Sequence, residues 1–240
     1  MAPTRSPRIA AARGGPGQTI AKVLVLFGSL LMISRAFWAP YWIPAGSMEP
    51  TLMSGDYLIV GRSLPPEPKR GDVLVFRHPV SHDYFIKRLI GLPGDQVQMK
   101  NGALHLNGGA VQAVPDGVLV APKGMMQRCV NDPVAPGGAC EREKFVETLP
   151  GGHSYTTLNT GMGPTDNTAV FTVPEGHYFF MGDNRDNSTD SRMNQLAGGV
   201  GFVPAENLTG QADRVMFSSA GRSLFHVWTW RADRFFKRIE

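Results

Sequence analysis

The motifs that this sequence lacks limit the kinds of catalytic and metal site that it can contain. Six histidines occur, but none lies in a recognisable catalytic triad motif. The G-x-S-x-G elbow is absent, because Ala45 and Glu49 stand where it requires glycine. The S-x-x-K motif is absent too, and the polar loop after Asp186 fails the EF-hand pattern because Ser191 and Ala197 replace its glycine and glutamate. A histidine-based serine hydrolase and an EF-hand are therefore disfavoured.

Acidic residues are missing from the first 22 positions, which carry four basic residues and a charge of +4. Residues 214–240 hold six basic residues against two acidic ones, again +4. Because the whole chain is +4, the segment between them is −4 by difference. A nucleic-acid binder usually places its positive charge on the folded domain. Basic ends rich in apolar residues are more typical of contact with a membrane surface.

A long uncharged apolar run is also missing. The stretch from Val23 to Ser34 is too short to span a bilayer alone, which takes about 20 residues. Lys22 and Arg35 can snorkel from its ends, and the aromatic residues of positions 37–42 can form an interfacial belt. A cleaved signal peptide is the alternative, although no small residues at an A-x-A spacing follow the run. We predict an uncleaved anchor, with a cytoplasmic N-terminus.

The abundance of turn formers favours short strands over a helical bundle, with 28 Gly and 19 Pro. Strand patterns occur at residues 56–62, 72–77 and 84–90, and a hairpin is expected at 96–106 around Asn101-Gly102. The predicted fold is mostly β: a β-rich catalytic core with an inserted smaller β subdomain, preceded by one N-terminal transmembrane helix. The expected segments are a disordered basic N-terminus (1–18), the anchor (19–40), the core in two parts (41–106 and 169–222), the insertion (107–168) and a basic aromatic tail (223–240).

Two further features leave alternatives open. The tail from Leu224 to Ile239 alternates aromatic and basic residues, which predicts a short amphipathic helix on the membrane surface or, alternatively, packing against the body. The chain has two cysteines, Cys129 and Cys140. Free thiols and a local disulfide both remain possible, since spacing cannot prove geometry.

A serine and a lysine offer a different catalytic chemistry. Ser47 lies in a turn of small residues, and its hydroxyl needs a base to become a nucleophile. Lys87 lies in an apolar run that begins with Phe85 and Ile86. A lysine can be that base when burial lowers its pKa of about 10.4 by about three units. Most strand lysines simply snorkel, so these residues alone leave both roles open. The polar loop at 182–192 is either a solvated loop or a hydrogen-bonded scaffold.

Three stretches together resemble bacterial type I signal peptidase (leader peptidase). They are Gly-Ser-Met-x-Pro-Thr-Leu around Ser47, Ile-Lys-Arg-x-Ile-Gly-Leu-Pro-Gly-Asp around Lys87, and Gly-Asp-Asn-Arg-Asp-Asn-Ser-x-Asp-Ser-Arg at 182–192. They occur in that family's order, after an anchor. The resemblance implies that Ser47 is the nucleophile, with its backbone N–H at the oxyanion, and that Lys87 is the general base. In the loop, Ser188 would orient the lysine amine, Asp190 and Arg192 would form a supporting ion pair, and Asp183 would lie beside them.

The resemblance also implies a substrate and a location. Such enzymes cut secretory preproteins after small residues at the first and third positions before the scissile bond, and the substrate would bind as an added strand. By motif position the substrate pockets should be lined by Ile43, Pro44, Met48, Leu52, Phe85 and Ile86. The enzyme would be a single-pass protein of the bacterial inner (cytoplasmic) membrane, facing the extracytoplasmic side and touching lipid. No cofactor, metal or nucleic acid is expected.

One departure and three rivals qualify this interpretation. Some relatives carry a Ser or Thr two residues before the nucleophile that helps to bind the oxyanion, but Ala45 has no such donor. Some relatives also have a disulfide in the insertion, which favours a Cys129–Cys140 bond. The rivals are a relative that matures conjugation pili, a repressor-type Ser–Lys autoprotease and an inactive, membrane-tethered module that binds exported peptides. The full loop motif argues against the first rival, the N-terminal anchor against the second, and the intact Ser47, Lys87 and Ser188 against the third.

Overall fold

The computed structural model describes residues 15–61, 67–124, 127–221 and 226–239. The prediction of disorder covers residues 1–18. Residues 1–14 lie outside the described residues, as do residues 62–66, but residues 16–18 belong to a helix, so that part of the prediction is wrong. The chain forms two compact units, residues up to Phe37 and residues Trp38–Glu240. The chemistry predicted above falls in the second unit.

The first unit contains helix α1, Pro16–Phe37. Proline suits the first turn of a helix, because its fixed φ is helical and its missing N–H would have no partner there. Nearly all of the large apolar side chains of α1 are exposed, and Pro16–Arg35 is long and apolar enough to cross a membrane, with a mean hydropathy of 1.6. The helix stops at Phe37 because the next residues pair as a strand. Residues 38–40, assigned above to the anchor, therefore belong to a β-strand.

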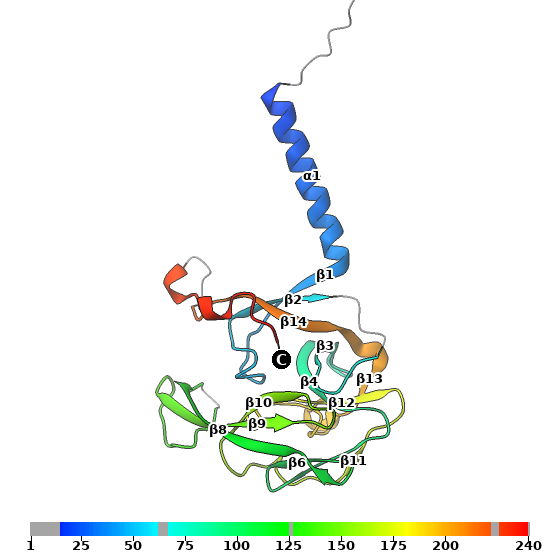
Figure 1. Ribbon diagram of the computed structural model, residues 1–240, viewed down its shortest axis with the longest axis vertical. Coiled ribbons are helices and arrows are strands. Elements are labelled where there is room, and N and C mark those ends of the chain that lie inside the picture. The colour runs from blue at the N-terminus through cyan, green and yellow to red at the C-terminus, as the bar shows by residue number, and fades with distance from the viewer. Residues whose placement is uncertain (1–14, 62–66, 125–126, 222–225, 240) are drawn as a thin grey trace, which may run out of the picture. The chain divides into compact units, whose positions relative to one another are not determined.

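The second unit is built on a seven-stranded antiparallel sheet (Figure 1). Its spatial order is β1 (Trp38–Trp42), β2 (Asp56–Gly61), β14 (Leu208–Ser218), β3 (Val73–Arg77), β4 (Tyr84–Gly91), β12 (His177–Met181) and β13 (Val203–Pro204). The central strand β3 is buried on both faces. Val73 and Val75 pack in one apolar cluster, and Leu74 and Phe76 pack in another.

Two smaller sheets complete this unit. One has the order β11 (Phe171–Thr172), β5 (Gln96–Lys100), β6 (Ala103–Leu106) and β7 (Gly109–Ala110); the other has the order β10 (Ser154–Asn159), β9 (Ala139–Thr148) and β8 (Gln112–Pro122). The predicted hairpin is confirmed, and Asn101 and Gly102 form its turn with positive φ angles of 48° and 78°. Residues 107–168 supply β7 to β10, although β7 shares a sheet with β5 and β6. The prediction of a mostly β fold is therefore confirmed.

The tail differs from its prediction. Over the described residues 226–239 it forms two 3₁₀ turns, Val227–Thr229 and Ala232–Arg234, and no α-helix. Val215 N donates to Lys237 O and Ile239 N to Asp213 O, both at 2.8 Å, so the end of the tail pairs with β14. An amphipathic helix would need those backbone groups for itself. The predicted helix is wrong because pairing with the sheet uses them instead.

Cys129 and Cys140 are joined by a disulfide bond. Cys140 lies in β9, and both cysteines are buried. The bond ties the segment between β8 and β9 to β9 itself, in the part of the chain where the resemblance placed it.

Candidate active site

The Ser47 hydroxyl and the Lys87 amine meet directly. Lys87 Nζ lies 2.6 Å from Ser47 Oγ, within a hydrogen bond. Ser47 opens a tight turn in which Leu52 N donates to Met48 O at 2.8 Å. Met48 and Leu52 are fully buried, and this burial anchors the turn on the apolar core. Within the described residues no histidine hydrogen-bonds to Ser47, so lysine is the base that the geometry offers.

Burial shapes the acid–base properties of Lys87, which is 4% exposed and projects from β4. Burial lowers the pKa of Lys87 from 10.5 to about 8, because the apolar surroundings disfavour the charged amine. Asp190 and Asp183 oppose this effect on the pKa, and Arg192 assists it. Much of the depression that general-base catalysis requires is thus built into the fold.

The loop at residues 182–192 follows β12 and holds the serine turn. Asn184 donates twice to it, from Nδ2 to Gly46 O at 2.9 Å and from the backbone N to Ser47 O at 3.1 Å. A Cβ added at Gly182 would lie 2.5 Å from Ser47 O, so only glycine permits this close approach. The loop therefore holds the backbone carbonyls of Gly46 and Ser47, at and just before the serine.

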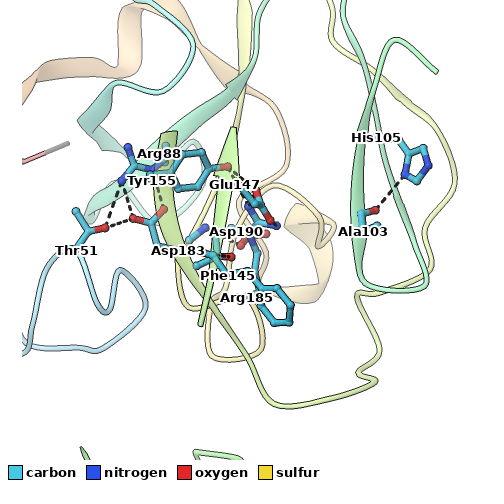
Figure 2. Close-up of polar contacts among 12 residues, drawn as sticks. Thr51, Arg88, Ala103, His105, Phe145, Glu147, Tyr155, Asp183, Arg185 and Asp190 are labelled. Carbon is cyan, nitrogen blue, oxygen red and sulfur yellow. Dashed lines mark hydrogen bonds and ion pairs between the residues drawn. The ribbon is translucent and has the colours of Figure 1, made fainter. Parts of the chain in front are cut away.

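Asp183 connects the loop to β4 and to the serine turn (Figure 2). Its carboxylate accepts from Arg88 Nε at 2.8 Å, from Arg88 Nη2 at 2.7 Å and from the Thr51 hydroxyl at 2.6 Å. Arg88 is fully buried, and its guanidinium carbon lies 4.2 Å from the centre of the Tyr155 ring. This two-pronged contact fixes the position of Lys87, its neighbour on β4.

Asp190 and Arg192 form a buried ion pair at 2.8 Å, as the resemblance implied. Burial alone would raise the pKa of Asp190, but the charge and hydrogen bonds of Arg192, together with a hydrogen bond from Gly182 N and the nearby Ser188 hydroxyl, hold that pKa below its usual value. Asp190 also accepts from Gly182 N at 3.0 Å. The pair therefore closes the loop on itself.

Ser188 packs against Gly182, where an added Cβ would lie 2.2 Å from its Oγ. This Oγ is buried and makes no hydrogen bond of regular geometry among the described residues, but the hydroxyl lies near enough to Asp190 to help lower the pKa of that carboxyl. The structure does not bring Ser188 into a hydrogen bond with Lys87, so its orienting role stays a prediction.

The residues expected to line the substrate pockets differ in exposure. Ile43, Met48 and Leu52 are buried in one apolar cluster with Ile86 packed against it. Phe85 and Ile86 are half-buried, and Pro44 is exposed. Phe85 packs against a different apolar cluster, which contains Phe76 and Phe180. The role of these residues in substrate binding stays a prediction.

Sequence reasoning missed several charged residues around the site. Arg142 pairs with Glu49, Arg185 forms two contacts of 2.6 and 2.5 Å with Glu147, and Arg234 pairs with Asp56 and donates to Thr51 O at 2.9 Å. The arginine of each pair is buried. Arg88 was missed as well, although it lies beside Lys87 in the same apolar run and is fully buried. The other partners lie too far apart in the chain for a local pattern to connect them.

Comparison with known proteins identifies the family. The family model described as "Signal peptidase, peptidase S26" matches residues 17–217. The signal peptidase I proteins of Rickettsia prowazekii (strain Madrid E) and Rickettsia typhi (strain ATCC VR-144 / Wilmington) are each 35% identical over 219 residues, covering 79% of this chain and 75% of the relative. A crystal structure of a signal peptidase I from Enterococcus faecalis V583 covers 62% of this chain and 98% of that chain, at 26% identity.

That crystal structure has a TM-score of 0.34, so the family assignment is based on the sequence relatives. The match over residues 17–217 includes Ser47, Lys87 and the whole 182–192 loop. The chain therefore belongs to the signal peptidase family, peptidase S26, and is a serine endopeptidase.

Proposed function

We propose that this chain is a membrane-bound endopeptidase that removes N-terminal signal peptides from exported preproteins, with Ser47 as nucleophile and Lys87 as general base. The observation that carries this proposal is the 2.6 Å contact between Lys87 Nζ and Ser47 Oγ, made by a lysine whose burial lowers its pKa to about 8. A neutral amine at this distance can take the serine proton.

The geometry supports a two-step hydrolysis. Neutral Lys87 accepts the Oγ proton as Ser47 attacks the scissile carbonyl, and the oxyanion that forms lies by the Ser47 N–H. Protonated Lys87 then gives its proton to the leaving amine, which departs as the new N-terminus of the mature protein. A water molecule then attacks the acyl carbon while Lys87 takes one of its protons. The ester bond to Ser47 Oγ breaks, Lys87 returns the proton to Oγ, and the signal peptide leaves with a new C-terminal carboxyl group.

An extended precursor can bind beside β4. The strand β12 pairs with β4 at Arg88, Leu89 and Gly91, whereas β3 pairs with residues 84–88 on the opposite edge. The β12-side edge of residues 84–87 has no strand partner among the described residues, and it leads to Lys87. A substrate strand added there would place its side chains against Phe85 and Ile86. A site crowded by half-buried apolar groups favours small residues by exclusion.

The membrane placement rests on α1 and on charge. A basic, acid-free N-terminus before a helix able to span favours a cytoplasmic N-terminus and an extracytoplasmic catalytic unit. The Cys129–Cys140 disulfide supports the same side, because such bonds persist in oxidising compartments. Exposed Trp228 and Phe236 on the tail support contact with lipid.

The test is cleavage of a labelled secretory precursor by the detergent-solubilised protein, beside Ser47→Ala and Lys87→Ala. Lys100→Ala is the matched control, because Lys100 is an exposed strand lysine. We expect wild type and the control to cut after a small-x-small sequence, while both site variants stay folded and inactive. Full activity of Lys87→Ala would overturn the assigned base, and failure of the wild type to cut would favour the peptide-binding module.

A further inference from the structure

We infer that Asn184 is a positioning residue for the oxyanion site: its side chain fixes the Gly46–Ser47 peptide unit so that the Ser47 N–H faces the substrate carbonyl. This inference rests on the proposed function, because it takes Ser47 as the nucleophile. It assigns to one side chain a task that the arrangement of Ser47 and Lys87 leaves open.

The argument begins with the planarity of a peptide unit. Gly46 C=O and Ser47 N–H belong to the same unit, and in a trans peptide the two groups point in opposite directions. Gly46 O accepts from Asn184 Nδ2 at 2.9 Å and from Glu49 N at 3.2 Å. Holding the carbonyl on one side therefore directs the N–H to the other side.

The Ser47 N–H has no acceptor among the described residues, as a donor kept for a ligand requires. Its neighbour Gly46 has no Cβ to restrict its backbone, so external contacts must set the orientation of this peptide. An added Cβ at Gly46 would lie 2.8 Å from the Glu49 carboxylate, so the side chain of residue 46 cannot be enlarged to stiffen the turn. Asn184 supplies the missing restraint from another element.

Asn184 is itself rigidly placed. It is 1% exposed and forms an isolated parallel bridge with Leu158 of β10. Leu158 N donates to Asp183 O at 2.8 Å, and Arg185 N donates to Leu158 O at 3.0 Å, so both neighbours of Asn184 are fixed. Its own N–H donates to Ser47 O at 3.1 Å. A side chain held in this way transmits the position of β10 to the nucleophile.

Ala45 makes this orientation consequential. The side chain two residues before the nucleophile is a methyl group, so it cannot donate to the oxyanion. The site then depends on the direction of a backbone N–H, and losing one oxyanion donor typically slows an enzyme about 100- to 1000-fold. Misdirecting the donor should produce a smaller loss, about 10- to 100-fold in kcat, with little change in KM.

The experiment measures kcat and KM of the full chain in detergent for Asn184→Ala and for Asn184→Asp, which keeps the shape but removes the donor. Asn207→Ala is the matched control, because Asn207 Nδ2 also donates to a backbone carbonyl, Arg77 O at 2.9 Å. Each Asn184 variant is repeated with Ala45→Ser, which adds a hydroxyl donor. If Asn184 acts through the oxyanion, its loss should reduce kcat less in the Ala45→Ser protein.

A second measurement separates orientation from folding. A short peptide aldehyde with Ala at the first and third positions binds when Ser47 Oγ adds to the aldehyde carbon, its proton passing through Lys87 to the former carbonyl oxygen of the hemiacetal. The matching peptide alcohol binds without forming that bond. Asn184→Ala should weaken aldehyde binding about 10- to 100-fold and leave alcohol binding unchanged. The ratio of the two affinities is independent of the folded fraction.

Equal losses for aldehyde and alcohol, an unchanged kcat, or the same loss of kcat with and without Ala45→Ser would overturn the inference. Retained cleavage by Ser47→Ala would instead overturn the proposed function. Loss of cleavage in Ser47→Ala together with a normal aldehyde-to-alcohol ratio in Asn184→Ala would reject the role of Asn184 alone.

Discussion

Lys87 is the residue at which the fold most clearly alters the chemistry of a side chain. Its amine is buried among apolar groups, yet two carboxylates and one guanidinium act on it from the 182–192 loop. Burial has the larger effect and lowers the pKa to about 8. The charged residues of the 182–192 loop therefore influence the fraction of enzyme molecules in which Lys87 is neutral near pH 7.

The pH dependence of kcat/KM should follow this balance. Below pH 8 the amine is mainly protonated, so kcat/KM should rise about tenfold per pH unit and level off above about 8. Asp190 raises the pKa of Lys87, so Asp190→Asn should move the rise toward lower pH. The measurement is a pH profile with a short peptide substrate, with Asp95→Asn as a control remote from the site. A rise that moves toward higher pH in Asp190→Asn would contradict this account.

Arg88 and Asp183 are predicted to matter first for stability. Both side chains are almost fully buried, and two hydrogen bonds join them. Removing either residue would leave the charge of the other buried without a counter-charge. Arg88→Met or Asp183→Ala should each lower the free energy of unfolding by about 3–5 kcal/mol.

Urea unfolding followed by tryptophan fluorescence checks this prediction. Arg77→Met is the control, because Arg77 is exposed and contacts the Tyr84 hydroxyl at 3.1 Å. A loss below 1 kcal/mol for both site variants would mean that water or other groups replace the lost partner.

At the scale of single residues, contacts predicted from the sequence agree with the structure where both partners belong to the recognised motifs. Ser47 and Lys87 meet as the resemblance implied, and Asp190 pairs with Arg192 two positions away. Asn184 and Arg142 carried no such signal, because their partners lie 138 and 93 positions away in the chain. The direction of a peptide unit and the pairing of distant charges arise from tertiary packing, which a local pattern does not contain.

At the scale of elements, the serine turn is held by three different parts of the chain. The 182–192 loop grips its backbone, β9 supplies Arg142 to Glu49, and the tail supplies Arg234 to Thr51 O. The Arg142–Glu49 pair connects the serine turn to the inserted sheet, and both residues are buried. Arg142 Nε has no partner in the described residues, so Glu49 is the main compensation for its charge.

A double-mutant cycle on this pair should show strong coupling. Arg142→Met and Glu49→Gln should each destabilise the protein by about 3 kcal/mol or more, while the double variant should lose less than the sum by at least 1 kcal/mol. Unfolding in urea measures the four free energies. The same cycle at Arg70 and Asp95, a less buried pair at 2.7 Å, is the comparison and should show weaker coupling. Strictly additive losses at Arg142 and Glu49 would show that the contact is not energetically important.

Elements with local partners were predictable, and the tail was not. The hairpin of β5 and β6 was correct because Asn-Gly turns and alternating strands act over a few residues. The tail pattern predicted a helix. Instead, the Phe235 and Phe217 ring centres lie 5.0 Å apart, and the backbone that follows Phe235 pairs with β14. The part of β14 beyond its pairing with β3 binds those backbone groups, and this competition cannot be predicted from the tail sequence alone.

At the scale of the whole molecule, the division into two compact units has a direct experimental consequence. Trp38 pairs with Gly61 through β1 and β2, so the second unit begins immediately after the helix. A fragment of residues 38–240 should fold and cleave a soluble peptide in detergent at close to the full-length rate.

A fragment of residues 43–240 is the contrasting case, because it lacks β1 but keeps the buried Ile43. It loses β1 and exposes the edge of β2, so its thermal midpoint should fall by several degrees relative to the fragment of residues 38–240. Circular dichroism and peptide cleavage compare the two fragments. Equal midpoints would show that β1 adds nothing to the stability of the second unit.

The contact between Arg234 and Thr51 has a consequence for timing. The two residues are 183 positions apart, so on a ribosome the serine turn is made long before the arginine that secures it. The loop that carries Asn184 and Asp190 also emerges late. We therefore expect a nascent chain to lack an assembled site until nearly all of the catalytic unit has been synthesised. Late assembly of this kind would keep a half-made protease from cutting the proteins that are exported beside it.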